Sequence, residues 1–220
     1  MAESFLQNKR ESILSDEELA CQVQAGSHAD FTELVNRYSV RLYHFLRHRT
    51  YNSQDAEDLV QETFIKSYIH IKKYRSKYKF STWLFTIAVR LAISHNRKKR
   101  VAAVESAGEY IQEYPGPGPA EILTQNEERQ NFWILARSLS NNQHDVLWFH
   151  YVENMPIKEI AQVMNKTQVH VKVLLHRARL NLAKRFTNAG DGVNVSTPPT
   201  AKEVTPQNNY KFSAKMVKEK

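Results

Sequence analysis

The spacing of hydrophobic residues along the chain predicts helices in most of its first hundred residues. Ser15 to Glu18 has the composition of a capping box, in which a serine hydroxyl and a glutamate carboxylate satisfy free backbone N–H groups at a helix start. This first helix should end near Gly26. Apolar residues then recur at steps of three and four, which predicts a second helix with one buried face. These residues are Phe31, Leu34, Val35, Tyr38, Leu42, Phe45 and Leu46.

Two more helices are expected before residue 100. Asn52-Ser53 can cap the first of them, which buries the stripe Leu59, Val60, Phe64 and Tyr68. Residues 76–79 interrupt the pattern with a polar, basic loop, and helical spacing resumes from residue 80. Together these segments predict a helical amino-terminal domain over residues 1–100.

The pattern stops after residue 100. Residues 101–125 lack sustained periodicity and include Pro115-Gly116-Pro117-Gly118-Pro119, which cannot be helical and suits an extended tether. We expect a flexible linker there. The polar segment 187–220, with three prolines, is expected to be an unordered tail.

A second domain is predicted over residues 126–186, where helical spacing returns through Phe132, Leu135 and Leu139. Within it, a short helix from Pro156 to Met164 and a final helix from Thr167 to about residue 186 are separated by a short break. Two helices joined in this way are typical of a helix-turn-helix. The predicted fold class is therefore all-α, with two helical domains joined by a flexible linker, the second a helix-turn-helix.

The final helix has two different faces. Val171, Leu175, Ala178 and Leu182 fall on one face and should pack inward. The other face can enter the major groove of DNA, where lysine and arginine reach guanine acceptors or phosphates. It carries Gln168, His170, Lys172, Val173, His176, Arg177 and Arg179. The alternative is an ordinary helical hairpin with a cationic surface.

The charge of the chain is arranged in blocks. Its formal net charge is +8, and the segment 66–100 holds eleven bases and no acid. The segment 166–185 holds six bases and no acid, while 102–128 holds six glutamates and no base. Two base-only blocks indicate two contacts with a polyanion, because solvated helix faces usually mix both signs. Tyr74 and Tyr78, beside the basic loop, could stack unpaired bases, whereas Trp83 and Phe85 should lie in the core.

Three stretches in this order resemble a bacterial RNA polymerase sigma factor: DAEDLVQETFIKSY (55–68), FSTWLFTIAVRLAISHNRKKR (80–100) and PIKEIAQVMNKTQVHVKVLLHRAR (156–179). The short two-domain form resembles the extracytoplasmic-function (ECF) group, and the likeness covers roughly residues 15–186. It implies a protein that binds core RNA polymerase, recognises promoter DNA as duplex and as melted strand, and assists strand opening. It implies no enzymatic activity, no metal and no cofactor. Members are often held by an anti-sigma factor, which makes one a candidate partner.

The resemblance also implies roles for individual residues. Those matching the helix that docks on the clamp helices of the largest polymerase subunit are Asp55, Asp58, Gln61 and Glu62. Those matching contacts to the minus-ten element are Tyr74, Lys77, Lys79, Arg90, Ser94 and Arg97, with Tyr74 in the aromatic position of the loop that captures a flipped base. Those matching contacts to the minus-thirty-five element are Thr167, Gln168, Lys172, His176, Arg177 and Arg179.

The chain departs from the family's pattern at several positions. Asn165 stands where the family often has glycine, and asparagine tolerates the left-handed backbone that such a turn needs. Val173 and Leu174 should place apolar groups near the groove, where thymine methyls or a partner could accept them. Arg90 replaces a frequent asparagine. These changes leave the promoter sequence open.

Two other functional classes would account for parts of the sequence. A helix-turn-helix regulator acting without polymerase explains residues 126–186 but leaves the acidic helix, the aromatic-basic block and the tether without a role. A Mg²⁺-dependent nuclease could use Asp55, Asp58 and Glu62, and His44 and His48 could share a metal, but neither set has a supporting context. With one cysteine, no apolar leader and no run of about 18 apolar residues, we expect a cytoplasmic protein.

Overall fold

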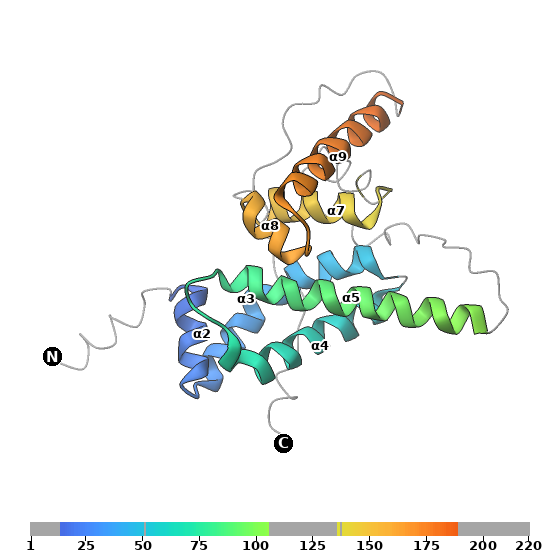
Figure 1. The fold of residues 1–220 in the computed structure, drawn as a ribbon. Helices are drawn as coiled ribbons and strands as arrows, with labels where there is room; N and C mark the ends of the chain where they lie inside the picture. The colour runs from blue at the N-terminus through green and yellow to red at the C-terminus, as the bar shows by residue number, and fades with distance from the viewer. Residues whose placement is uncertain (1–13, 51, 106–135, 137, 189–220) are drawn as a thin grey trace.

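A computed structural model describes residues 14–50, 52–105, 136 and 138–188, and every regular element in these ranges is helical (Figure 1). The all-α prediction is therefore confirmed. In chain order the elements are α2 (Asp16–Gln24), α3 (His28–Arg49), α4 (Ser53–His70), η1 (Ile71–Lys73), α5 (Phe80–Glu105), α7 (Asn141–Leu147), η3 (Trp148–Val152), α8 (Ile157–Val163) and α9 (Gln168–Asn188). No helix in the described ranges is both long and apolar enough to cross a membrane.

The helix starts lie where the capping residues predict them. Ser15 and Glu18 form a reciprocal capping box at α2. The side chain of Asn52 accepts the N–H of the third residue of α4, and the hydroxyl of Thr167 accepts the N–H of His170 at 3.2 Å. These contacts satisfy backbone donors that would otherwise lack partners at each helix end.

Some boundaries differ from the prediction. Helix α5 continues to Glu105, so residues 101–105 are helical rather than part of a linker, because this segment contains two alanines and no glycine or proline. Pro156 is the N-cap of α8, not its first helical residue. The rest of the expected linker, the stripe positions Phe132 and Leu135, and the tail beyond residue 188 lie outside the described residues.

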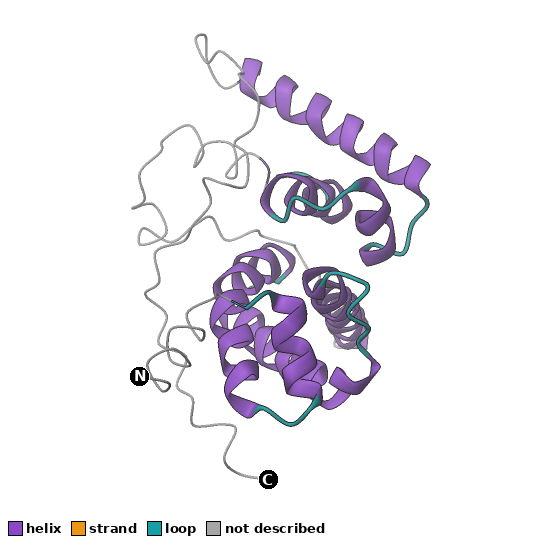
Figure 2. Cartoon of the chain, turned by 90° about the vertical axis from the view of Figure 1, so that its left-hand side faces the viewer, coloured by secondary structure: helices purple, strands orange, loops and turns teal. Residues whose placement is uncertain are grey.

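The helices form two units, which lie one above the other in Figure 2. The N-terminal unit comprises α2, α3, α4, η1 and α5, and the C-terminal unit comprises α7, η3, α8 and α9. Leu34, Leu42 and Leu84 are fully buried in the first, and Leu147 and Ile160 in the second. The units touch through α3 and α5 on one side and α7 and α8 on the other.

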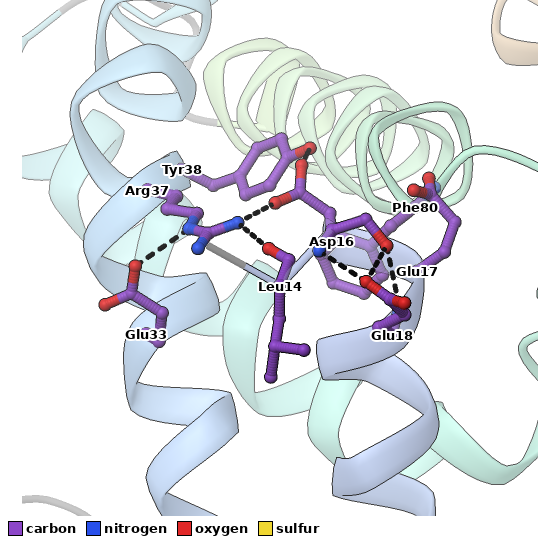
Figure 3. Close-up of polar contacts among 9 residues, drawn as sticks. Leu14, Asp16, Glu17, Glu18, Glu33, Arg37, Tyr38 and Phe80 are labelled. Carbon is purple, nitrogen blue, oxygen red and sulfur yellow. Dashed lines mark hydrogen bonds and ion pairs between the residues drawn. The ribbon is translucent and has the colours of Figure 1, made fainter. Parts of the chain in front are cut away.

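Polar contacts attach α2 to the rest of the N-terminal unit (Figure 3). Asp16 accepts from the guanidinium of Arg37 at 2.8 Å and from the hydroxyl of Tyr38, both on α3. Glu17 accepts the backbone N–H of Phe80, the first residue of α5, at 2.9 Å. Burial, reinforced by Asp16, raises the pKa of Tyr38, so its hydroxyl stays a donor. Helix α2 therefore fixes the start of α5.

Candidate polymerase and nucleic-acid interfaces

One face of α4 presents acidic and amide groups to solvent. Asp58 and Glu62 are exposed, and Gln61 is half-buried beside them. Glu62 pairs with Lys66 one turn later at 2.9 Å. Asp55, the remaining residue predicted to bind polymerase, faces α5 instead of solvent. It forms an ion pair with Lys99 and lies 3.4 Å from the imidazole of His95. Asp55 thus joins α4 to α5, while Asp58 and Glu62 remain available to a partner.

Two isoleucines extend this face and were missed by the sequence reasoning. Ile65 is 51% exposed and Ile69 is 65% exposed. They follow Glu62 at helical steps of three and four, so they lie on the same side of α4. This spacing was the available signal, since Ile65 and Ile69 fall outside the buried stripe of the helix. Neighbouring exposed apolar side chains mark a surface that a partner can cover.

The loop between η1 and α5 places its two tyrosines in different environments. Tyr74 is only 4% exposed, its ring centroid lies 5.6 Å from that of Phe80 and 5.4 Å from that of Trp83, and its hydroxyl donates to the carbonyl of Tyr78 at 2.6 Å. The expectation that Tyr74 stands outside the core is therefore wrong, because neighbouring rings enclose it. Tyr78 is exposed, as a ring that stacks on a base must be, and the ammonium of Lys77 lies 5.0 Å from its ring centroid.

The same loop is held from α2. The side-chain amide of Gln24 donates to the carbonyl of Ile71 at 2.7 Å and to the carbonyl of Tyr74 at 2.8 Å. With Glu17 on the N–H of Phe80, α2 binds the backbone on both sides of residues 75–79. Burial raises the pKa of Tyr74 above that of a free phenol, which keeps its hydroxyl a donor to the loop. No pattern in the sequence indicated that Gln24 would contact this loop.

An open surface hollow of about 340 Å³ between α4 and α5 is lined by several basic side chains. Its lining includes the apolar side chains of Ile87 and Leu91 together with Arg90 and Ser94, both predicted for the minus-ten strand. The complete lining is Glu62, Lys66, His70, Ile87, Arg90, Leu91, Ser94, His95 and Lys98. The predicted Arg97, Lys77 and Lys79 are exposed outside it. Apolar side chains beside basic ones suit a nucleotide, because the base can contact the apolar side chains and the phosphate can contact the basic ones.

Helix α9 has the two faces that its sequence predicts. Val171, Leu175, Ala178 and Leu182 are buried. The opposite face is exposed over the predicted contacts Thr167, Gln168, Lys172, His176, Arg177 and Arg179. The turn before it passes through Asn165 at φ 51°, the left-handed backbone expected there.

Leu174 and Arg179 give this face of α9 a different form from the predicted one. Leu174 packs into the core, so of the two residues predicted to place an apolar group near the groove only Val173, 41% exposed, does so. Val169, 72% exposed, adds an apolar group that was not predicted. Arg179 donates to the hydroxyl of Tyr151 at 2.8 Å and lies over its ring, which holds the arginine against η3. Burial and the charge of Arg179 both lower the pKa of His150.

The residues of the other functional hypotheses do not gather around a metal position. Within the described ranges, no group of three or more histidine, cysteine, aspartate or glutamate side chains could hold a metal ion. His48 is buried with its ring stacked on that of His144, whereas His44 packs against Tyr43. The two histidines proposed as a pair are thus occupied with different neighbours.

Two family models match the chain in sequence order: Sigma-70 region 2 over residues 34–101 and Sigma-70 region 4 over residues 132–182. The chain is 30% identical over 174 residues to the ECF RNA polymerase sigma factor SigW of Bacillus subtilis. The matched region spans 75% of this chain and 93% of SigW. It is 31% identical over 160 residues to the ECF RNA polymerase sigma factor SigM of the same organism. This match spans 72% of this chain and 95% of SigM.

Solved structures share the fold. The sigma factor RpoE of Bartonella quintana, in complex with the anti-sigma factor NepR, matches with a TM-score of 0.62 and 23% identity over 72% of this chain and 97% of that one. CnrH, in complex with the cytosolic domain of CnrY, matches with a TM-score of 0.58 and 22% identity over 80% and 99%. At this identity the likeness concerns the arrangement of helices.

Proposed function

The chain belongs to the extracytoplasmic-function sigma factors of RNA polymerase, and from that membership we propose how its residues share the work of starting transcription. It is a sigma factor that binds core polymerase and recognises promoter DNA, not a regulator acting alone. The observation that carries this is the presence of both sigma regions in order on one chain. Sigma factors are in general initiation factors without enzymatic activity, and we propose that this one acts in the cytoplasm.

We assign polymerase binding to α4. Asp58, Gln61 and Glu62 supply polar contacts, and the exposed Ile65 and Ile69 supply apolar area that the polymerase would bury. Asp55 acts indirectly, since its ion pair with Lys99 of α5 fixes the orientation of the helix.

We assign the melted minus-ten strand to the loop and to the groove between α4 and α5. Lys77 and Lys79 follow the phosphates, Tyr78 offers an exposed ring, and Arg90 and Ser94 line the groove. The buried Tyr74 stabilises the loop through the hydrogen bond from its hydroxyl to the carbonyl of Tyr78. Stacking contributes about 1–3 kcal/mol per base, so this unit cannot melt a promoter alone and requires the polymerase.

We assign the duplex minus-thirty-five element to α9. Lys172 and Arg177 can reach guanine acceptors or phosphates, and Gln168 can pair with adenine. Arg179 is already bonded to Tyr151, so it is better placed for a phosphate beside the groove than for a base edge. We further propose an anti-sigma factor as a partner, by analogy with the complexes in which RpoE and CnrH were solved.

Run-off transcription tests this function directly. Core polymerase, the chain and a genomic fragment library should give discrete transcripts that are absent without the chain, and their start sites supply the promoter sequence. The isolated chain should bind promoter duplex weakly. Reconstituted holoenzyme that makes no transcript from any fragment would overturn the proposal, and strong sequence-specific binding without polymerase would favour a stand-alone regulator.

A further inference from the structure

The exposed face of α9 has an apolar centre, formed by Val169 and Val173. Residues four apart on an α-helix point only about 40° away from each other, so the two side chains lie one above the other. Val171 falls between them in sequence but on the opposite side of the helix, where it is buried. Helix α9 packs on α7 and α8 through that buried side, and in Figure 1 its other side faces no described helix. We call Val169 and Val173 the valine strip.

The valine strip adds little to the stability of the folded chain. Valine forms helix less readily than alanine, lysine or glutamine, and side chains this exposed leave much of their apolar area in water. The start of α9 is already fixed by Thr167, whose hydroxyl accepts the N–H of His170 at 3.2 Å. Single exposed apolar residues are common on protein surfaces, whereas adjoining ones mark a surface that a partner covers. The strip is therefore expected to contact a partner.

The charges beside the strip favour DNA as that partner. The exposed Lys172 and Arg177 flank the strip on its two sides, where they can contact phosphates. Val169 is the second residue of α9, and the first residues of a recognition helix are those that reach base edges. An apolar strip between two cations thus lies where the floor of a major groove would meet it.

The major groove offers one kind of apolar group to such a strip. Guanine, adenine and cytosine present donors and acceptors there, whereas thymine presents an acceptor and the methyl group on its C5 atom. A cytosine methylated at C5 carries its methyl group on the same ring atom, so it offers the same apolar contact. Deoxyuridine lacks the methyl group and is otherwise identical to thymine at this edge. The strip is therefore complementary to the methyl group itself.

We infer that Val169 and Val173 read the C5-methyl groups of two pyrimidines in the minus-thirty-five element, whether these are thymines or 5-methylcytosines. The inference rests on the proposed function, because α9 must lie in the major groove for the strip to meet base edges. It adds a chemical property to that function. The chain distinguishes a promoter methylated on cytosine at these positions from the same promoter without the methyl group, and it binds the methylated one more tightly.

Helix geometry limits where the two methyl groups can lie. The Cβ atoms of residues four apart on a helix are about 5–6 Å from each other. Base pairs follow one another at about 3.4 Å along B-form DNA. Two methyl groups that contact the strip together therefore lie within about two base-pair steps of each other.

Removal of the methyl groups tests the inference on DNA. The probe is a promoter recovered by run-off transcription from the genomic library, bound by reconstituted holoenzyme. Each thymine of its minus-thirty-five region, on either strand, is replaced in turn by deoxyuridine. Affinity should fall about fourfold at each of two positions, the value of one buried methyl-sized group, and about 15-fold when both are replaced. Unchanged affinity at every position would overturn the inference.

Addition of a methyl group tests the preference for methylated cytosine. At each of the two positions the thymine–adenine pair is replaced by cytosine–guanine, with and without a methyl group on the cytosine C5 atom. The two probes differ only in that methyl group, so other losses caused by the exchange of pairs cancel in their ratio. The methylated probe should compete about fourfold better for holoenzyme. Equal competition by the two probes would overturn this part of the inference.

Substitutions in the strip test which side chains read the methyl groups. Val169→Ala should remove the dependence on one methyl group and Val173→Ala the dependence on the other, while alanine preserves the helix. Leu180→Ala is the matched control, since Leu180 is another exposed apolar residue of α9 but lies about 16 Å further along the helix axis than Val169. This control should retain both dependences. A double valine variant that still prefers the methylated probes would overturn the inference.

The outcomes separate this inference from the proposed function. Holoenzyme that makes transcripts but ignores the methyl groups would refute the inference and leave the sigma function intact. Valine variants, shown to be folded by circular dichroism, that lose core polymerase binding and keep the parent's response to methyl groups would instead assign the strip to a protein contact. Holoenzyme that makes no transcript would refute the function itself.

Discussion

Replacement of Gln24 by glutamate should weaken capture of the melted minus-ten strand. The side-chain amide donates two hydrogen bonds, to the carbonyls of Ile71 and Tyr74, and these bonds hold the start of the loop that carries Lys77, Tyr78 and Lys79. A carboxylate has nearly the same shape but no proton to donate, so it would face two carbonyl oxygens. The start of the loop then loses its two hydrogen bonds from Gln24 and gains a repulsion, while the contact of Glu17 with Phe80 remains.

The magnitude follows from the two bonds. Each contributes about 0.5–1.5 kcal/mol net, so the ordered loop loses about 1–3 kcal/mol before any repulsion. This corresponds to roughly 5- to 150-fold in the equilibrium constant for ordering the loop, which is the upper bound on the loss of affinity for a strand that needs the ordered form. Gln24→Ala, which removes the bonds without adding a charge, should lose less than Gln24→Glu.

The assay uses holoenzyme and a single-stranded minus-ten oligonucleotide with 2-aminopurine at the captured base, whose fluorescence rises as the base leaves the stack. Binding of a duplex that contains only the minus-thirty-five element serves as the internal reference. Gln22→Glu makes the same change of charge at an exposed position of α2 and should be neutral. Equal behaviour of the two glutamate variants, or equal loss on both DNA probes, would refute the reasoning.

Three further predictions follow from exposed and titrating groups. The double variant Ile65→Ala, Ile69→Ala should weaken core polymerase binding by about tenfold or more, because each methylene that the polymerase buries contributes about 0.8 kcal/mol. Its melting temperature should not change, since both side chains are exposed in the free chain. Unaltered binding would show that these residues lie outside the interface. Val173→Ala should lower minus-thirty-five affinity on thymine templates but not on templates with deoxyuridine, which lacks the methyl group; equal loss on both would exclude methyl contact. Burial and Arg179 lower the pKa of His150, so this histidine binds a proton more weakly in the folded chain than in the unfolded one. The free energy of unfolding measured in urea should therefore decrease as pH falls through about 6.5. His150→Gln should flatten this pH dependence, and an unchanged slope would contradict the prediction.

Features set by neighbouring residues could be predicted from the sequence. The capping side chains Ser15, Asn52 and Thr167 act within one helical turn, so their residue types and spacing reveal the helix starts. The left-handed turn at Asn165 is equally local. The buried and exposed faces of α9 follow from a period of 3.6 residues, which a sequence displays directly.

Features set by distant residues could not be predicted. Gln24 meets a loop 47 and 50 positions away, and Asp55 meets Lys99 44 positions away, so no local pattern reveals either contact. The burial of Tyr74 depends on rings supplied by α5. Leu174 falls at the edge of its helix stripe, where a shift of a few degrees decides between solvent and core. The contact between Arg49 of α3 and Asp145 of α7 depends on how the two units are placed, which no local pattern reveals.

The unbroken course of α5 limits how this protein can evolve. Thr82 near its start bonds Glu159 of α8, Arg90 in its middle lines the cavity beside α4, and Lys99 toward its end pairs with Asp55 of α4. All three lie on one helix of 26 residues. One inserted residue would turn everything after it by about 100° and move it by about 1.5 Å. Descendants of this chain can therefore exchange side chains along α5 to suit new promoters, but a single-codon insertion or deletion within it would abolish several contacts at once.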